Sequence, residues 1–229
     1  MIPGRIIEVY NEASNRMGLV EFDGKRRAIY LSLVPDAKVG DMVRFHAGFA
    51  TGRVNVEEAE NAGEVFGRAP KHETPARRME TDRAFRVLCE LEPRQLRMLI
   101  PLADDKHFAT GDIIFSSGEK SLFLHLIVSG DVALEAVSDR HTVGVQTLRA
   151  GDAMGWSALT SDGITHFQAR ALTPVATIAF AGDSLRAACE RDPAMGYALM
   201  KRLMELATER LDAMRLRLVE KSKTAAANG

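Results

Sequence analysis

The chain has 229 residues and a mass of 25.1 kDa, with 30 Lys and Arg residues against 31 Asp and Glu residues. This length suits one large or two small domains. A hydrophobic fraction of 46% with 27% charged residues is typical of a folded globular chain and excludes a largely disordered one. The formal net charge of -1 gives no electrostatic reason to expect nucleic acid or an anionic membrane as partner.

Targeting and redox features point to an ordinary intracellular chain. No apolar run approaches the ~20 residues needed to cross a bilayer, and the start at Met1–Arg5 lacks the layout of a signal peptide. Cys89 and Cys189 are too few for a disulfide framework or a thiolate metal cluster. We therefore expect a cytoplasmic protein of two domains that does not contact a membrane.

The first fifty residues predict a small β-barrel. Short strand-like runs alternate with turn residues such as Asp23-Gly24 and Val39-Gly40. Evenly spaced strands in so short a stretch favour a closed barrel, because closure leaves no sheet edge. The expected strands are 5–10, 17–22, 27–33 and 41–46. After this domain, at 1–62, a Pro- and charge-rich linker is expected at 63–80.

The second domain, expected at 81–222, mixes strands with flanking helices. Apolar residues at helical spacing around Pro93 predict two short helices, and a strand-rich region with glycine turns follows from His107 to about Phe180. A long helix begins near Pro193, and residues 223–229 are expected to be a disordered tail. Its apolar stripe comprises Leu199, Leu203, Leu206, Ala207, Leu211, Met214 and Leu218.

The strings at 2–6, 33–41 and 46–50 resemble, in order and spacing, the HypC/HupF family of hydrogenase assembly chaperones over residues 1–62. The resemblance implies an OB-like β-barrel that helps to assemble the Fe(CN)₂CO centre of [NiFe]-hydrogenase. It also implies docking on a hydrogenase large subunit or on a HypD-like maturation scaffold. The partner-binding residues that match the family pattern are Ile2, Pro3, Gly4, His46, Gly48 and Phe49.

One position departs from that family pattern. Family members place a cysteine directly after the initiator methionine, whereas Met1 here directly precedes Ile2. Because a thiolate holds Fe(II) and a thioether is a poor substitute, we expect no bound metal. Either the true start lies upstream or the barrel keeps only the docking surface, and we favour the second. His46 either contacts the partner or is a strand-end histidine bonded to a carbonyl.

The strings 111–115, 118–119, 122–134 and 148–159 resemble the cyclic-nucleotide-binding domain of the CRP and kinase-regulatory type. That resemblance implies a β jelly roll with its glycines at turns. In the family, a glutamate binds the ribose 2′-hydroxyl and an arginine clamps the cyclic phosphate. Trp156 stands at the glutamate position, and the arginine position falls on or near Thr165.

Tight binding of cAMP or cGMP is therefore disfavoured, and no cofactor is expected. Loss of one charge-assisted phosphate contact costs a few kcal/mol, about two decades of affinity. Trp156 either stacks on a ring ligand or fills an emptied pocket, and we favour the second. His166 or Arg170 is a candidate replacement for the lost arginine if strand alternation puts them on one face. The remaining pocket candidates are Gly155, Ser157 and Ala158.

The long helix resembles the dimer-forming helix of CRP-type proteins, and Leu211, Met214 and Leu218 are expected to form a homodimer seam. Because no helix-turn-helix follows, we expect no DNA binding. No catalytic triad, P-loop or zinc motif is recognised, so we expect no enzyme activity. The leading hypothesis is a non-catalytic adaptor in hydrogenase maturation, and the alternative is a sensor of cyclic nucleotides or other small ligands.

Overall fold

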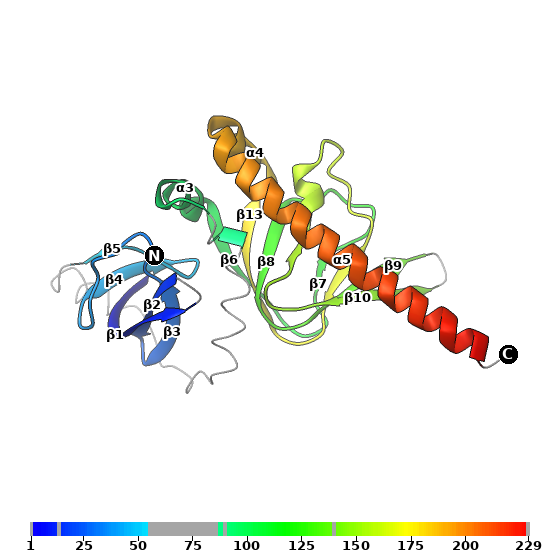
Figure 1. Cartoon of the computed structure of the whole chain (residues 1–229), viewed down its shortest axis with the longest axis horizontal. Helices are drawn as coiled ribbons and strands as arrows, with labels where there is room; N and C mark the ends of the chain where they lie inside the picture. Colours follow the sequence, from blue (N-terminus) through cyan, green and yellow to red (C-terminus); the bar gives the residue numbers. More distant parts are fainter. Residues whose placement is uncertain (1, 13–14, 55–86, 89–90, 139–140, 228–229) are drawn as a thin grey trace.

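The computed structural model describes residues 2–12, 15–54, 87–88, 91–138 and 141–227, with side chains beyond 216 described only at Val219. In these ranges no helix combines the length and the hydropathy needed to span a membrane. A small barrel, blue to cyan in Figure 1, lies beside a larger β domain, along which one long helix runs. The expected mainly-β fold, a small barrel followed by a second β domain, is confirmed, whereas the expected linker at 63–80 and its boundaries lie outside the described residues.

Five strands close the N-terminal barrel in the order β1-β2-β3-β5-β4. They are β1 (Ile2–Glu12), β2 (Asn15–Phe22), β3 (Lys25–Tyr30), β4 (Met42–His46) and β5 (Phe49–Arg53). Four of them match expected strands, whereas β5 was not expected, because its short sequence contains Gly52 and lacks polar–apolar alternation. Strand β5 completes the barrel through a single parallel pairing with β3, Tyr30 opposite Phe49.

The second domain contains two four-stranded sheets, in the orders β10-β9-β12-β7 and β11-β8-β13-β6. This is the expected jelly roll. The strands are β6 (Ala103–Phe108), β7 (Ile113–Phe115), β8 (Phe123–Ser129), β9 (Val132–Val137), β10 (Thr142–Leu148), β11 (Ala153–Met154), β12 (Gln168–Ala171) and β13 (Val175–Ala181). The short helix η3 (Trp156–Leu159) follows β11, and α4 (Gly182–Arg191) follows β13.

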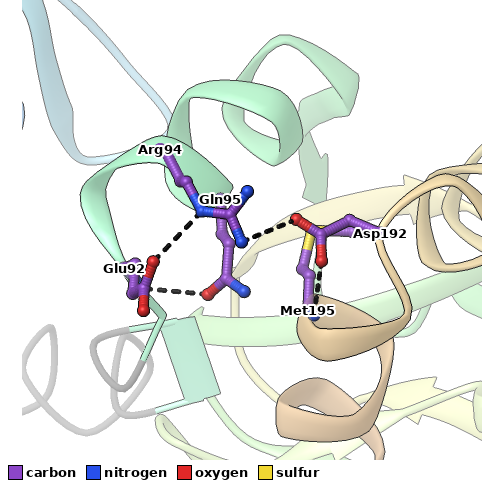
Figure 2. A network of polar contacts seen from close by, with 5 residues as sticks. All are labelled: Glu92, Arg94, Gln95, Asp192 and Met195. Carbon is purple, nitrogen blue, oxygen red and sulfur yellow. Dashed lines mark hydrogen bonds and ion pairs between the residues drawn. The ribbon is translucent and has the colours of Figure 1, made fainter.

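Helix α3 (Pro93–Leu99) is fixed to the start of α5 (Pro193–Ala227) by a polar network (Figure 2). The amide of Glu92 donates to Gln95 Oε1 at 2.9 Å, which begins α3 with a capping box. Arg94 reaches from α3 to Asp192, with 3.5 Å between Nη2 and Oδ2. Asp192 also accepts from the Met195 amide at 3.0 Å, as an N-cap residue does. The helical segment η2 (Ile100–Leu102) continues from α3.

Helix α5 covers the jelly roll with one face and leaves another face exposed. Leu199, Leu203 and Leu206 are buried, as their spacing predicted. The helix continues to Ala227, past Ser222, where we expected a disordered tail. The alanines that end the helix have the highest intrinsic helix propensity, which accounts for the extension.

One titratable side chain is buried in the core of the second domain. His125 on β8 is only 5% exposed, and 3.0 Å separate its Nδ1 from Thr177 Oγ1. The rings of Phe108 and Phe123 flank the imidazole. Burial, with a smaller contribution from the charge of Lys106, lowers the pKa of His125 from 6.5 to about 4. Between pH 6.5 and about 4, this imidazole is therefore neutral in the folded protein and protonated in the unfolded chain.

Because the folded pKa lies below the unfolded one, stability is lost as pH falls from 6.5 towards 4. We expect the free energy of unfolding in urea to fall by about 2 kcal/mol between pH of about 7.5 and about 5. His125→Gln, which retains a hydrogen-bonding group for Thr177 but does not titrate, should remove most of that loss. An equal loss in the variant would contradict the assignment.

Candidate functional site

Two of the motif strings meet at one end of the barrel. Ile2 pairs with Phe45 and Gly4 with Val43 across β1 and β4, so the 2–4 string lies beside the strand that ends at His46. A Cβ atom on Gly4 would lie 2.3 Å from Val20 Cγ1, so this position has no room for a side chain. Pro3 and Ile2 are half-buried, and Ile2 packs against the barrel's own core.

The turn after His46 positions an aromatic pair. Ala47 and Gly48 both have positive φ, of 47° and 80°, as a two-residue hairpin turn requires. The amide of Tyr30 donates to the Gly48 carbonyl at 2.8 Å. The rings of Tyr30 and Phe49 then stack, with 5.1 Å between centroids. The hairpin therefore closes the barrel and holds the two rings at this end.

His46 contacts the second domain directly. Its Nε2 lies 2.7 Å from the carbonyl oxygen of Ala103, and because a carbonyl only accepts, Nε2 is the donor. Ala103 is the first residue of β6, which lies at the edge of its sheet and pairs with β13. His46 thus pairs with a backbone group at a sheet edge.

The barrel end and the second domain form one continuous apolar cluster, called here the shared cluster. Phe49 is 0% exposed and Tyr30 2%. The barrel contributes Met17, Ala28, Tyr30, Leu33, Ala47 and Phe49. The second domain contributes the other members, which are Val87, Leu88, Leu91, Leu96, Leu99 and Ile100 together with core residues of its strands and of α4 and α5. Of the expected partner-binding residues, His46 and Phe49 therefore contribute to the contact between the domains.

The loop after β11 forms one wall of a cavity in the second domain. Gly155 has φ of 75°, and a Cβ atom there would lie 2.3 Å from the Phe123 carbonyl oxygen. The cavity measures about 230 Å³. It is lined mainly by apolar side chains, and Gly155, Trp156, Ser157, Thr165 and His166 all contribute. Trp156 is therefore part of the wall and does not fill the pocket.

The two positions that carry the charged ligand contacts in the family, occupied here by Trp156 and Thr165, have no charged side chain at this cavity. Thr165 is 3% exposed, and its hydroxyl lies 2.5 Å from the Ser116 carbonyl oxygen and 3.0 Å from that of Glu119. The hydroxyl therefore bonds to backbone. At the glutamate position, Trp156 has the guanidinium of Arg210 over its ring, 4.3 Å from the centroid.

Arg210 also lines the cavity, although it was not among the expected pocket residues. It comes from α5, and its Nη2 donates to the Ala153 carbonyl at 2.5 Å. Burial lowers the pKa of its guanidinium, which the charge of Asp152 partly opposes. Arg210 follows Leu206 by four residues, so the two side chains lie on the same face of the helix. This spacing could have predicted that Arg210 faces the barrel.

Two other expected pocket residues lie elsewhere. Strand β12 begins at Gln168, so His166 precedes it and strand alternation with Arg170 does not apply. Arg170 Nε pairs instead with Glu135, 3.2 Å from Oε2, and Arg170 is not among the cavity-lining residues. Ala158 lies at a different cavity of about 580 Å³, beside α4.

The two domains are similar to different sets of known proteins. Residues 1–66 match the model of the HupF/HypC family. The hydrogenase maturation factor HypC of Cupriavidus necator is 37% identical over 75 residues, which are 33% of this chain and 80% of that protein. The chain belongs to the HupF/HypC family.

The second domain matches the cyclic nucleotide-binding domain model at residues 105–192. A putative cyclic nucleotide-binding protein from Geobacter metallireducens GS-15 is 29% identical, with a TM-score of 0.51, over 61% of this chain and 99% of that one. A cyclic nucleotide-binding domain from Methylobacillus flagellatus KT has a TM-score of 0.55 over 64% of this chain and 85% of its own. At 16% identity, that second likeness shows the fold alone. This chain thus joins a HypC-like barrel to a domain that matches the cyclic nucleotide-binding domain model.

Apolar residues along α5 recur at coiled-coil spacing. Tyr197, Met200, Met204 and Leu211 are between 41% and 73% exposed. Together with the half-buried Ala207 and Met214 they are separated alternately by three and four residues, and Ala207, Leu211 and Met214 also line the cavity beside Trp156. Leu218 continues the series, but its side chain lies outside the described residues.

Within the part of the chain that the structure describes, no group of three His, Cys, Asp or Glu residues is placed to hold a metal.

Proposed function

We propose that this protein is a cytoplasmic, non-catalytic accessory factor in [NiFe]-hydrogenase maturation. Its HypC-like barrel docks on a hydrogenase large subunit or on a HypD-like scaffold. The observation that supports this most is the 37% identity to a hydrogenase maturation factor over 80% of that factor's length. The barrel also leaves no room for a side chain at Gly4, so its packing requires the glycine of the family's motif at this position.

Deletion of the gene in its host should lower hydrogenase activity, and the full chain should restore it. A Gly4→Val chain should fail to restore activity, because the new side chain collides with Val20. Gly144→Ala is the matched control, since nothing lies within 4 Å of a Cβ atom there. Hydrogenase assays on cell extracts give the readout. Unchanged activity in the deletion strain would contradict the proposed function.

The exposed seam of α5 supports a further proposal, a homodimer through this helix. Apolar residues at alternating spacings of three and four pack as knobs into holes against a second helix. A second copy of the chain offers the same seam, as twofold dimers require.

Light scattering should give a mass twice the chain's 25.1 kDa. Leu211→Glu places a charge in the seam and should give a monomer. Leu216→Glu is the matched control, since Leu216 is also exposed, at 60%, but lies outside the seam. A monomeric wild-type chain, or a dimer unaffected by Leu211→Glu, would contradict the dimer.

The cavity beside Trp156 favours a second candidate function, the sensing of a small ligand. Its walls are mainly apolar. By the family resemblance, Trp156 stands at the position of the charged ribose contact, and Thr165 stands at or near that of the charged phosphate contact. We propose that it takes a planar, largely apolar molecule, and that cyclic nucleotides bind poorly. Arg210 at the wall carries five N–H donors, enough to hold one acceptor group of such a ligand as well as the Ala153 carbonyl.

Because Trp156 is the chain's one tryptophan, its fluorescence reports on this cavity. Anilinonaphthalene sulfonate should quench the emission saturably, and cAMP should have no effect up to about millimolar levels. Ser157→Phe, which fills the cavity, should abolish the quenching, whereas Ser184→Phe on the exposed face of α4 should not. Saturable quenching by micromolar cAMP would contradict this candidate.

A further inference from the structure

Arg210 is the one fully charged side chain among the described residues that line the cavity beside Trp156, and this lining contains no aspartate or glutamate. The ion pairs of the described residues do not include Arg210. Burial lowers the pKa of its guanidinium, and the charge of Asp152 opposes this effect. A half-buried cation therefore stands at a mainly apolar wall without a carboxylate partner from the described residues.

The guanidinium of Arg210 is held in place and keeps donors for a ligand. Its carbon Cζ lies 4.3 Å from the centroid of the Trp156 ring, and Nη2 donates to the Ala153 carbonyl at 2.5 Å. That hydrogen bond uses one of the five N–H groups of an arginine. Two parallel N–H groups of a guanidinium match the two oxygens of a carboxylate. The remaining donors are therefore suited to an anion in the cavity.

The other polar groups of the wall leave this role to Arg210. The hydroxyl of Thr165 bonds to the backbone carbonyls of Ser116 and Glu119. Ser157 adds a hydroxyl to the lining, and His166 adds an exposed imidazole. None of these side chains is negatively charged, so none repels an anionic ligand.

The size of the cavity and its aromatic walls define the rest of the ligand. An apolar cavity of about 150 Å³ holds one benzene molecule, whereas this cavity measures about 230 Å³. It has room for a single aromatic ring with one small substituent. Phe115, Trp156 and Phe167 are among the lining residues, and aromatic rings pack on one another by offset stacking or edge contacts. A cyclic nucleotide, with its purine, ribose and cyclic phosphate, is larger.

We propose that the cavity binds a one-ring aromatic carboxylate, with the ring against Trp156 and the carboxylate on the free donors of Arg210. This assignment rests on the small-ligand candidate function proposed above and names the class of ligand that is sensed. The family resemblance puts the anion contact at or near Thr165, whereas here Arg210 of helix α5 supplies it. Arg210 is then the residue that sets ligand specificity.

Fluorine NMR titrations of the full chain test the ligand class with two compounds of the same shape. The compound 4-fluorobenzoate carries a carboxylate where 4-fluorobenzamide carries a neutral amide. The benzoate should bind about tenfold more tightly or better, because only the anion forms a bidentate, charge-assisted pair with Arg210. Ser157→Phe, which fills the cavity, should abolish the binding of both compounds. Equal Kd values for the two compounds in the wild type would overturn the assignment.

Arg210→Gln removes the charge and keeps an amide donor for the Ala153 carbonyl. It should weaken 4-fluorobenzoate binding about tenfold or more and leave the Kd of the benzamide within about twofold. Arg215→Gln is the matched control, since Arg215 is an exposed arginine of the same helix outside the cavity lining, and it should change neither Kd. Arg210→Lys, which keeps a charge without the fork, should recover part of the preference. A preference for the benzoate that survives Arg210→Gln would overturn the role of Arg210.

Anilinonaphthalene sulfonate separates failure of this assignment from failure of the candidate function. If it quenches Trp156 saturably while neither fluorinated compound binds, the cavity takes ligands and the one-ring carboxylate class is wrong. If neither the sulfonate nor the fluorinated compounds bind, the small-ligand candidate function is contradicted as well.

Discussion

The parallel pairing of Tyr30 with Phe49 supports both halves of the molecule. It is the register pair that joins β3 to β5 and closes the barrel. The same two rings stack and enter the apolar cluster that includes α3 and η2. Truncation of a buried Phe costs about 3–5 kcal/mol, so this single residue contributes to barrel closure and to domain contact at once.

The family's motif string at 46–50 closes the barrel and contacts the second domain in this chain. The string from His46 to Ala50 makes the tight turn that brings Phe49 opposite Tyr30, and it places the His46 donor at the rim. Here the second domain supplies an apolar surface and the Ala103 carbonyl, so His46 and Phe49, which we expected to bind a partner, take part in packing within the chain.

Much of the fold could be predicted from the sequence, because turns and apolar periodicity are local. The barrel and the long helix followed from them, whereas the jelly roll was implied by the resemblance of the strings within 111–159 to the cyclic-nucleotide-binding domain. The contact of His46 with Ala103 spans 57 residues, and no local pattern encodes such a pairing. In the cavity, the positions of Trp156 and Thr165 were recognisable from the motif, whereas Arg210 depends on how α5 lies across the barrel.

The central claim is that the two domains share one core, and scanning calorimetry tests it most directly. The wild-type chain should unfold in one transition, and Phe49→Ala should move that whole transition to lower temperature. Phe45→Ala, in the barrel's separate core cluster, should move the same single transition. Two independent transitions, with Phe49→Ala shifting only the barrel's, would contradict a shared core.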